Sequence, residues 1–184
     1  MQRIAPAQWQ RQPWKNGGGI THEIWRDGDG PHGFALRLSA AEVASDGPFS
    51  RFPGIDRTIL LLDGRGFHLQ RDEGSASASH AVDQVGVPFA FRGEEAWQCR
   101  LVDGPVLDLN LMVDRDRARA SLSVAAAGAP AEVVSAARVL AFALGDDVVL
   151  RHGGATAALA RWETALARGQ VQITGPCVVV ALHD

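Results

Sequence analysis

The sequence has few cysteines, no tyrosine and no strong excess of either charge. Cys99 and Cys177 are its only cysteines and lie far apart, which excludes a disulfide-dense secreted scaffold and a cysteine-based zinc site. The formal net charge of −3 provides no basic surface for nucleic acid or for an anionic membrane. We therefore expect no nucleic-acid partner, no membrane partner and a reducing, cytoplasmic location.

Long hydrophobic runs are missing as well. The longest aliphatic run, residues 178–182, is too short to span a bilayer, and the first six residues lack the apolar segment of a signal peptide. Nevertheless, 46% of the 184 residues are hydrophobic and 21% are charged. This composition supports a folded core, either in one large β-type domain or in two small ones.

Glycine and proline are frequent and evenly spread. Twenty glycines and nine prolines divide the chain into short apolar runs, a pattern typical of an all-β sandwich or barrel. Pairs such as Asp63-Gly64 supply the positive φ angles that tight hairpins need. The predicted strands are residues 21–25, 34–39, 57–62, 66–70, 97–102, 108–113, 139–144, 148–151, 157–162, 171–174 and 177–183.

Two segments interrupt this rhythm. Residues 73–81 are small and polar, and we expect a mobile loop or a short helical turn there. Residues 115–134 are expected to connect an N-terminal half to a shorter C-terminal half, either as plain connector or with an extended strand in it. Because an aliphatic run ends in a glycine turn in both halves, the sequence suggests a duplicated barrel. The predicted domains are residues 1–115 and 116–184, packed as one unit with strand exchange between them.

Several motifs resemble the HutD/Ves family of bacterial proteins. They are Pro-Trp-Lys-Asn-Gly-Gly-Gly at 13–19, Arg-Leu-Ser at 37–39, the segment 46–57, Phe-Arg-Gly-Glu at 91–94 and Asp-Leu-Asn-Leu-Met at 108–112. The resemblance implies a duplicated cupin (bicupin) fold, with two jelly-roll-like β-barrels in one chain. It also implies a link to histidine utilisation, in which the protein senses or binds an acidic intermediate rather than catalysing a step.

The metal motifs of cupins are not found at the corresponding positions. Counting back seven positions from Gly64, where cupins place a glutamate ligand, gives Arg57, and residues 50–53 contain none of the expected histidines. The second motif also lacks its histidine, because residues 94–96 are glutamate, glutamate and alanine. We expect no metal and no cofactor, since the histidines are scattered singly; they are His22, His32, His68, His80, His152 and His183.

In the place of a glutamate metal ligand, Arg57 would make the cupin cavity favour anions instead of cations. A guanidinium is a permanently charged, planar donor that suits a carboxylate and repels a divalent cation. Strand alternation places Arg57 on the same face as Ile59 and Leu61, so its stem is expected to line a partly apolar pocket. The alternative is that Arg57 pairs with Glu23, Asp56 or another local acid to hold strands together.

Five further polar residues are candidate ligand contacts. Lys15 and Asn16 precede three glycines, which either approach a ligand closely or form a sharp entry into the next strand. Arg37 and Ser39 share a strand face that points to solvent or to a polar cavity. Asn110 is placed to orient a ligand carbonyl or to satisfy backbone groups. Aromatic residues that either roof the cavity or belong to ordinary core are Trp14, Phe49, Phe52 and Trp97.

The sequence therefore predicts an all-β, metal-free protein that binds a small anionic metabolite. Arg57 is the expected anchor, and the resemblance implies a formylglutamate- or urocanate-like ligand. No catalytic residue is assigned. The alternatives are a metal-independent isomerase or hydrolase that uses Glu23 or Asp56 as general base, and an interaction role in which the C-terminal half forms a homodimer.

Overall fold

The computed structural model describes residues 1–73 and 76–183, which form two compact units. One unit is Gln10–Arg117, and the other combines Met1–Trp9 with Ala118–Asp184. The expectation of an all-β chain is confirmed. The described residues contain one helical element, the short 3₁₀ turn η1 (Pro6–Gln8), and no helix among them has the length and apolar character of a membrane span.

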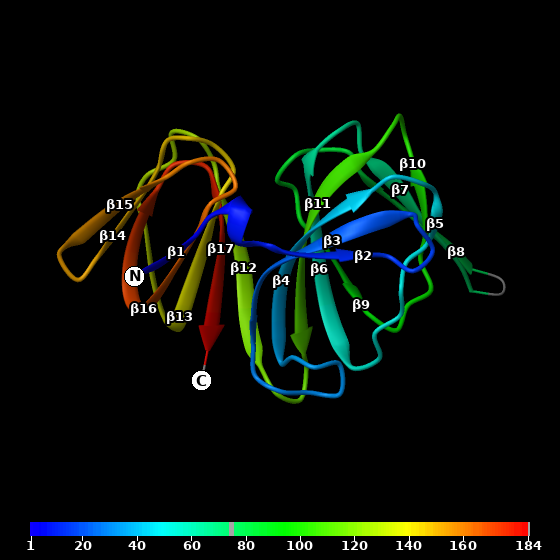
Figure 1. Ribbon diagram of the computed structural model, residues 1–184, viewed down its shortest axis with the longest axis horizontal. Helices are drawn as coiled ribbons and strands as arrows, with labels where there is room; N and C mark the ends of the chain where they lie inside the picture. The colour runs from blue at the N-terminus through cyan, green and yellow to red at the C-terminus, as the bar shows by residue number, and fades with distance from the viewer. Residues whose placement is uncertain (74–75, 184) are drawn as a thin grey trace. The chain divides into compact units, whose positions relative to one another are not determined.

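The unit Gln10–Arg117 contains two antiparallel sheets (Figure 1). The larger has the order β2-β3-β4-β11-β6-β9, and the smaller has the order β5-β10-β7-β8. The strands of the larger sheet are β2 (Gln10–Pro13), β3 (Gly19–Asp27), β4 (Leu36–Val43), β11 (Val106–Asp114), β6 (Ile55–Asp63) and β9 (Phe89–Arg92). Those of the smaller sheet are β5 (Gly47–Pro48), β10 (Gln98–Leu101), β7 (Phe67–Glu73) and β8 (Ala76–Val82).

One hydrophobic cluster joins these two sheets. Its buried members include Ile59 and Leu61 from β6, Phe67 and Leu69 from β7, and Cys99 from β10. Burial raises the pKa of the Cys99 thiol to about 12, so this side chain acts as a small apolar group rather than as a nucleophile. The cluster fixes the position of the larger sheet against the smaller one.

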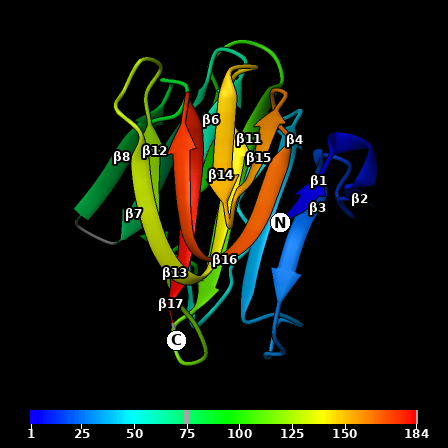
Figure 2. The same cartoon turned by 90° about the vertical axis from the view of Figure 1, so that its left-hand side faces the viewer.

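The second unit contains one sheet of order β12-β17-β13-β16-β14-β15, with β1 paired to β16 (Figure 2). Its core is formed by alternating aliphatic residues of β13, β16 and β17. The strands are β1 (Gln2–Ile4), β12 (Arg119–Ala125), β13 (Glu132–Ala143), β14 (Val148–His152), β15 (Ala155–Leu159), β16 (Thr164–Thr174) and β17 (Cys177–His183). Because β1 pairs with β16, residues 1–9 belong to this unit and not with residues 10–117.

One loop prediction is wrong. Residues 73–81 are expected to form a mobile loop or a short helical turn, but β8 pairs with β7 there; residues 74–75 lie outside the described part. In residues 115–134 the extended strand expected within the connector is confirmed as β12, and the start of β13 lies there as well. The sheets do not close into barrels in the part of the chain that the structure describes, so the duplicated barrel stays a prediction.

Candidate functional site

The register of three central strands places polar residues in rows on one face of the larger sheet. Met112 on β11 lies opposite Arg37 on β4 and opposite Arg57 on β6. Two residues earlier on β11, Asn110 lies opposite Ser39. Because side chains alternate between the faces of a strand, these residues share a face.

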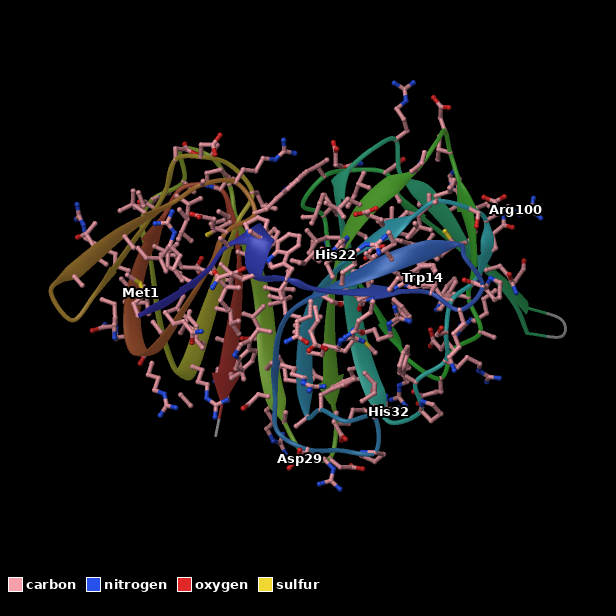
Figure 3. All side chains as sticks on the ribbon, in the orientation of Figure 1. Met1, Trp14, His22, Asp29, His32 and Arg100 are labelled. Atoms are coloured by element: carbon pink, nitrogen blue, oxygen red, sulfur yellow. The ribbon has the colours of Figure 1, made fainter. Side chains whose placement is uncertain are left out.

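A cavity of about 480 Å³ lies against this face, within the size range of small-molecule sites. All six residues that the sequence singles out line it, so the structure brings them together from β4, β6, β11 and the segment before β3. They are Lys15, Asn16, Arg37, Ser39, Arg57 and Asn110. Further lining residues include Gln12, Trp14 (labelled in Figure 3), Thr21, Phe49, Phe52, Asp108 and Met112. Trp97 does not line this cavity and belongs to the core cluster.

The segment before β3 forms one rim of the cavity. Lys15 and Asn16 are exposed, and the Asn16 Oδ1 atom accepts a hydrogen bond from the Gly18 amide at 3.1 Å. A Cβ atom at Gly19 would lie only 2.3 Å from the Glu42 carbonyl oxygen and 3.0 Å from the Trp14 ring. The glycines therefore serve the sharp entry into β3, because only a residue without a side chain permits this close approach.

Arg57 lies buried against three aromatic rings. Its side chain is 6% exposed, and its guanidinium carbon lies 4.9 Å from the Phe91 ring centroid, 5.4 Å from that of Phe49 and 5.5 Å from that of Phe52. Its Nη1 atom donates to the Ser50 carbonyl oxygen at 3.2 Å, while Nε has no hydrogen-bond partner. Burial lowers the pKa of Arg57 to about 10, so its charge is held in an unfavourable environment.

Glu23 and Asp56, the two acids named as alternative partners of Arg57, are bound to other arginines, and Asp108 is the acid whose charge attracts Arg57. Glu23 pairs with Arg37 at 2.9 Å, and Asp56 pairs with Arg115 at 2.8 Å. The alternative in which Arg57 pairs with either acid is therefore wrong. Among the described residues, no carboxylate lies within ion-pair distance of Arg57.

Arg37, in contrast, is a neutralised cation. Its side chain is 13% exposed, its Nε atom faces the buried Glu23 carboxylate and its Nη2 atom donates to Gln12 Oε1 at 2.8 Å. We expect Arg37→Met to lower the free energy of unfolding by about 3 kcal/mol, because the substitution leaves the Glu23 charge buried without its close partner. Urea unfolding at neutral pH measures this loss.

The matched control for this substitution is Arg26→Met. Arg26 lies 3.5 Å from the same Glu23 carboxylate but is 58% exposed, so its loss should cost less than about 0.5 kcal/mol. Equal losses in the two variants would show that the Glu23–Arg37 pair has no special role in stability.

Asp108 is the site residue that sequence reasoning missed. It is 2% exposed, it lines the cavity and its Oδ1 atom has no hydrogen-bond partner. Burial raises the pKa of Asp108 to about 7, against the attraction of Arg57. The available signal was strand alternation, which places Asp108 on the same face of β11 as Asn110 and Met112. The Asn110 Oδ1 atom is also buried without a partner.

The described residues contain no group of three or more histidine, cysteine or acidic side chains placed to hold a metal ion. A second, more open hollow of about 630 Å³ lies beside β8 and β9. Its lining includes His80, which stacks on Phe89 with ring centroids 3.7 Å apart. Arg57 lines both hollows, but the cavity of about 480 Å³ remains the better site, because Asp108 and Asn110, each with a buried oxygen that lacks a partner, line it as well.

Comparisons with known proteins agree with one another. The HutD family model matches residues 6–179. An uncharacterised 21.2 kDa protein of the hutC 3' region in Pseudomonas putida is 38% identical over 155 residues, which cover 84% of this chain and 79% of that protein. Protein Ves of Escherichia fergusonii is 36% identical over 113 residues, and this match covers 61% of the chain and 57% of Ves.

Solved structures extend the likeness over the whole chain. HutD from Pseudomonas fluorescens SBW25, determined in a formate condition, has a TM-score of 0.86 at 32% identity, covering 99% of this chain and 97% of that one. A conserved protein of unknown function from Pseudomonas aeruginosa PAO1 has a TM-score of 0.87 at 34% identity, with 100% and 98% covered. Oxalate decarboxylase from Lactobacillus farciminis has a TM-score of 0.66 at 7% identity, covering 98% and 85%, and shows that the all-β fold is cupin-like.

Proposed function

Because this chain belongs to the HutD family, we propose that it is a metal-free binding protein for a small anionic metabolite and acts as a regulator or sensor in histidine utilisation. One observation carries the proposal: the buried guanidinium of Arg57 lines a cavity of ligand size and has no carboxylate partner. A ligand carboxylate would supply the missing charge and accept from Nε. The P. putida relative, named for the hutC 3' region, supports the pathway.

The proposed ligand is a formylglutamate- or urocanate-like acid. Arg57 would anchor its carboxylate, while Ser39 and Asn110 would contact its polar groups within the cavity and Lys15 and Asn16 would do so at the rim. The aromatic rings of Phe49 and Phe52 add apolar contact. About a dozen heavy atoms at roughly 0.4–0.6 kcal/mol each give a Kd of about 10 µM to 0.2 mM.

Calorimetric titration tests this function. N-formyl-L-glutamate is compared with its dimethyl ester and urocanate with its methyl ester; the esters keep the skeleton and remove the negative charge of the carboxylates. We expect at least one acid to bind in the stated range and its ester to bind at least about tenfold more weakly. Elemental analysis of the protein as purified should find no stoichiometric metal. Stoichiometric transition metal, or no binding of either acid, would contradict the proposal.

One observation favours an enzyme as the second candidate. The pKa of Asp108, at about 7, lies in the range of a general base. Glu23 and Asp56, the acids expected for this role, do not line the cavity. Turnover of N-formyl-L-glutamate or urocanate by metal-stripped protein, lost in Asp108→Asn, would support catalysis.

The wider proposal includes the duplicated cupin arrangement, a cytoplasmic location and homodimer formation through the C-terminal half. The likeness to oxalate decarboxylase over 98% of the chain supports the cupin part. Sizing at several protein concentrations tests the dimer.

A further inference from the structure

Two buried groups of opposite charge line the cavity and lack hydrogen-bond partners at one atom each. Asp108, on β11, is 2% exposed and has a free Oδ1 atom. Arg57, on the neighbouring strand β6, is 6% exposed and has a free Nε–H. No ion pair joins these two side chains in the part of the chain that the structure describes. Both side chains line the same cavity, so an anion bound there would change the electrostatic surroundings of both.

The ionisable side chains around Asp108 lie on several neighbouring strands. Arg57 on β6 attracts its negative charge, whereas Arg37 on β4 is bound to Glu23 on β3. Cys99 on β10 interacts with Asp108 but stays a neutral thiol at physiological pH, and Lys15 lies exposed at the rim. Arg57 is therefore the charge that favours ionised Asp108.

A bound carboxylate changes this balance. It neutralises Arg57 and adds a second negative charge inside the same cavity. Burial already raises the pKa of Asp108 to about 7, and loss of the attraction by Arg57 would raise it further. An ionised Asp108 would then be left buried beside an anion, which is strongly unfavourable.

We infer that the cavity binds its carboxylate ligand together with one proton, which Asp108 holds. Arg57 supplies the positive charge that the ligand carboxylate needs, and protonation of Asp108 removes the competing negative charge from the same cavity. The proton comes from solvent, and no covalent bond is formed or broken. This inference rests on the proposed function and assigns Asp108 as its specificity-determining residue. A cavity of this kind responds to the metabolite and to pH at once.

The alternative is an ionised Asp108 that accepts a hydrogen bond from an N–H group of the ligand. That arrangement satisfies Oδ1, but it takes up no proton. The two arrangements therefore differ in proton stoichiometry, which calorimetry measures directly.

The test uses N-formyl-L-glutamate and the full chain. Heats of binding at about pH 7.5 are compared in buffers of different ionisation enthalpy, and Kd is measured between about pH 6 and 9. The ligand carboxylates stay ionised over this range, and no histidine lines the cavity. We expect uptake of about 0.5–1 proton and a Kd that rises by up to about tenfold per pH unit above pH 7.

Asp108→Asn should remove both the proton uptake and the pH dependence while still binding the ligand. The control is Asp63→Asn, an exposed acid at the end of β6, which should retain both. Wild-type binding with no proton uptake, or uptake that persists in Asp108→Asn, would overturn the inference and leave Arg57-dependent anion binding intact. No binding by the wild-type protein would overturn the proposed function as well. The wild-type measurement decides the case even if Asp108→Asn fails to fold.

Discussion

Replacing Arg57 by methionine is expected to weaken carboxylate binding by about 1.5–3 kcal/mol, or about 10- to 150-fold. The substitution removes a desolvated, charge-assisted contact. Methionine replaces the apolar stem of Arg57 with a flexible apolar side chain but not the guanidinium that lies over Phe49, Phe52 and Phe91. Calorimetric titration of N-formyl-L-glutamate into both proteins measures the change. Unchanged affinity would remove Arg57 as the anion anchor.

The same substitution should leave the fold at least as stable as before. The pKa of Arg57, lowered to about 10, shows that the folded state holds this charge less readily than the unfolded chain does, at every pH below 10. Replacing an uncompensated buried charge by an apolar side chain should therefore raise the free energy of unfolding by about 1–3 kcal/mol. Urea unfolding at about pH 6 is suitable, because Asp108 is then protonated in the folded state with or without Arg57.

The control is Met112→Leu, which conserves side-chain volume in the wall of the same cavity and should change stability by less than about 1.5 kcal/mol. A gain in stability that accompanies a loss of binding separates a functional charge from a structural one. If Arg57→Met instead destabilised the protein as strongly as Arg37→Met, Arg57 would have to be treated as a structural cation.

The sequence predicted much of this site because its central strands obey simple alternation. On β4 and β11 the polar residues Arg37, Ser39 and Asn110 alternate with buried leucines, so their shared face follows from the period of two. Counting from Gly64 identified Arg57 without any structure. Edge strands were harder to predict. In β8 only Val82 is β-branched, so the composition does not favour a strand, and the pairing with β7 stabilises it instead.

The pairing of charges could not be predicted from sequence. The sequence does not show that Glu23 forms its ion pair with Arg37 or that Asp56 pairs with Arg115. Both pairs depend on strand register and on the path of a loop. The bulge in the pairing of β3 with β4, between Glu23 and Trp25, changes which residues are neighbours there. Strand alternation places Asp108 on the face of Asn110, but its complete burial in the cavity wall depends on how the strands pack and could not be predicted.

The buried carboxyl of Asp108 is expected to cause a large pH effect on stability. Its pKa, about 7 in the folded state, lies well above the ordinary value of 3.8, so between these two pH values the folded state binds more protons than the unfolded chain. The contribution of Asp108 to the free energy of unfolding is therefore fully present below about pH 4 and declines as the pH rises to about 7. Asp108→Asn removes the titrating group and should raise the free energy of unfolding by about 2–4 kcal/mol at pH 7.

Urea unfolding of both proteins at several pH values isolates this contribution, because other carboxylates act equally on the two curves. The difference in the free energy of unfolding should be small near pH 4, grow through pH 5 and 6, and level off above about pH 7. Asp63→Asn provides the comparison for removal of an exposed negative charge and should give a nearly flat difference. A constant difference for Asp108→Asn would mean that Asp108 is ionised in the folded state at all these pH values. The cavity would then hold a permanent carboxylate beside Arg57, and a ligand with a donor group, rather than a carboxylate alone, would be the better match.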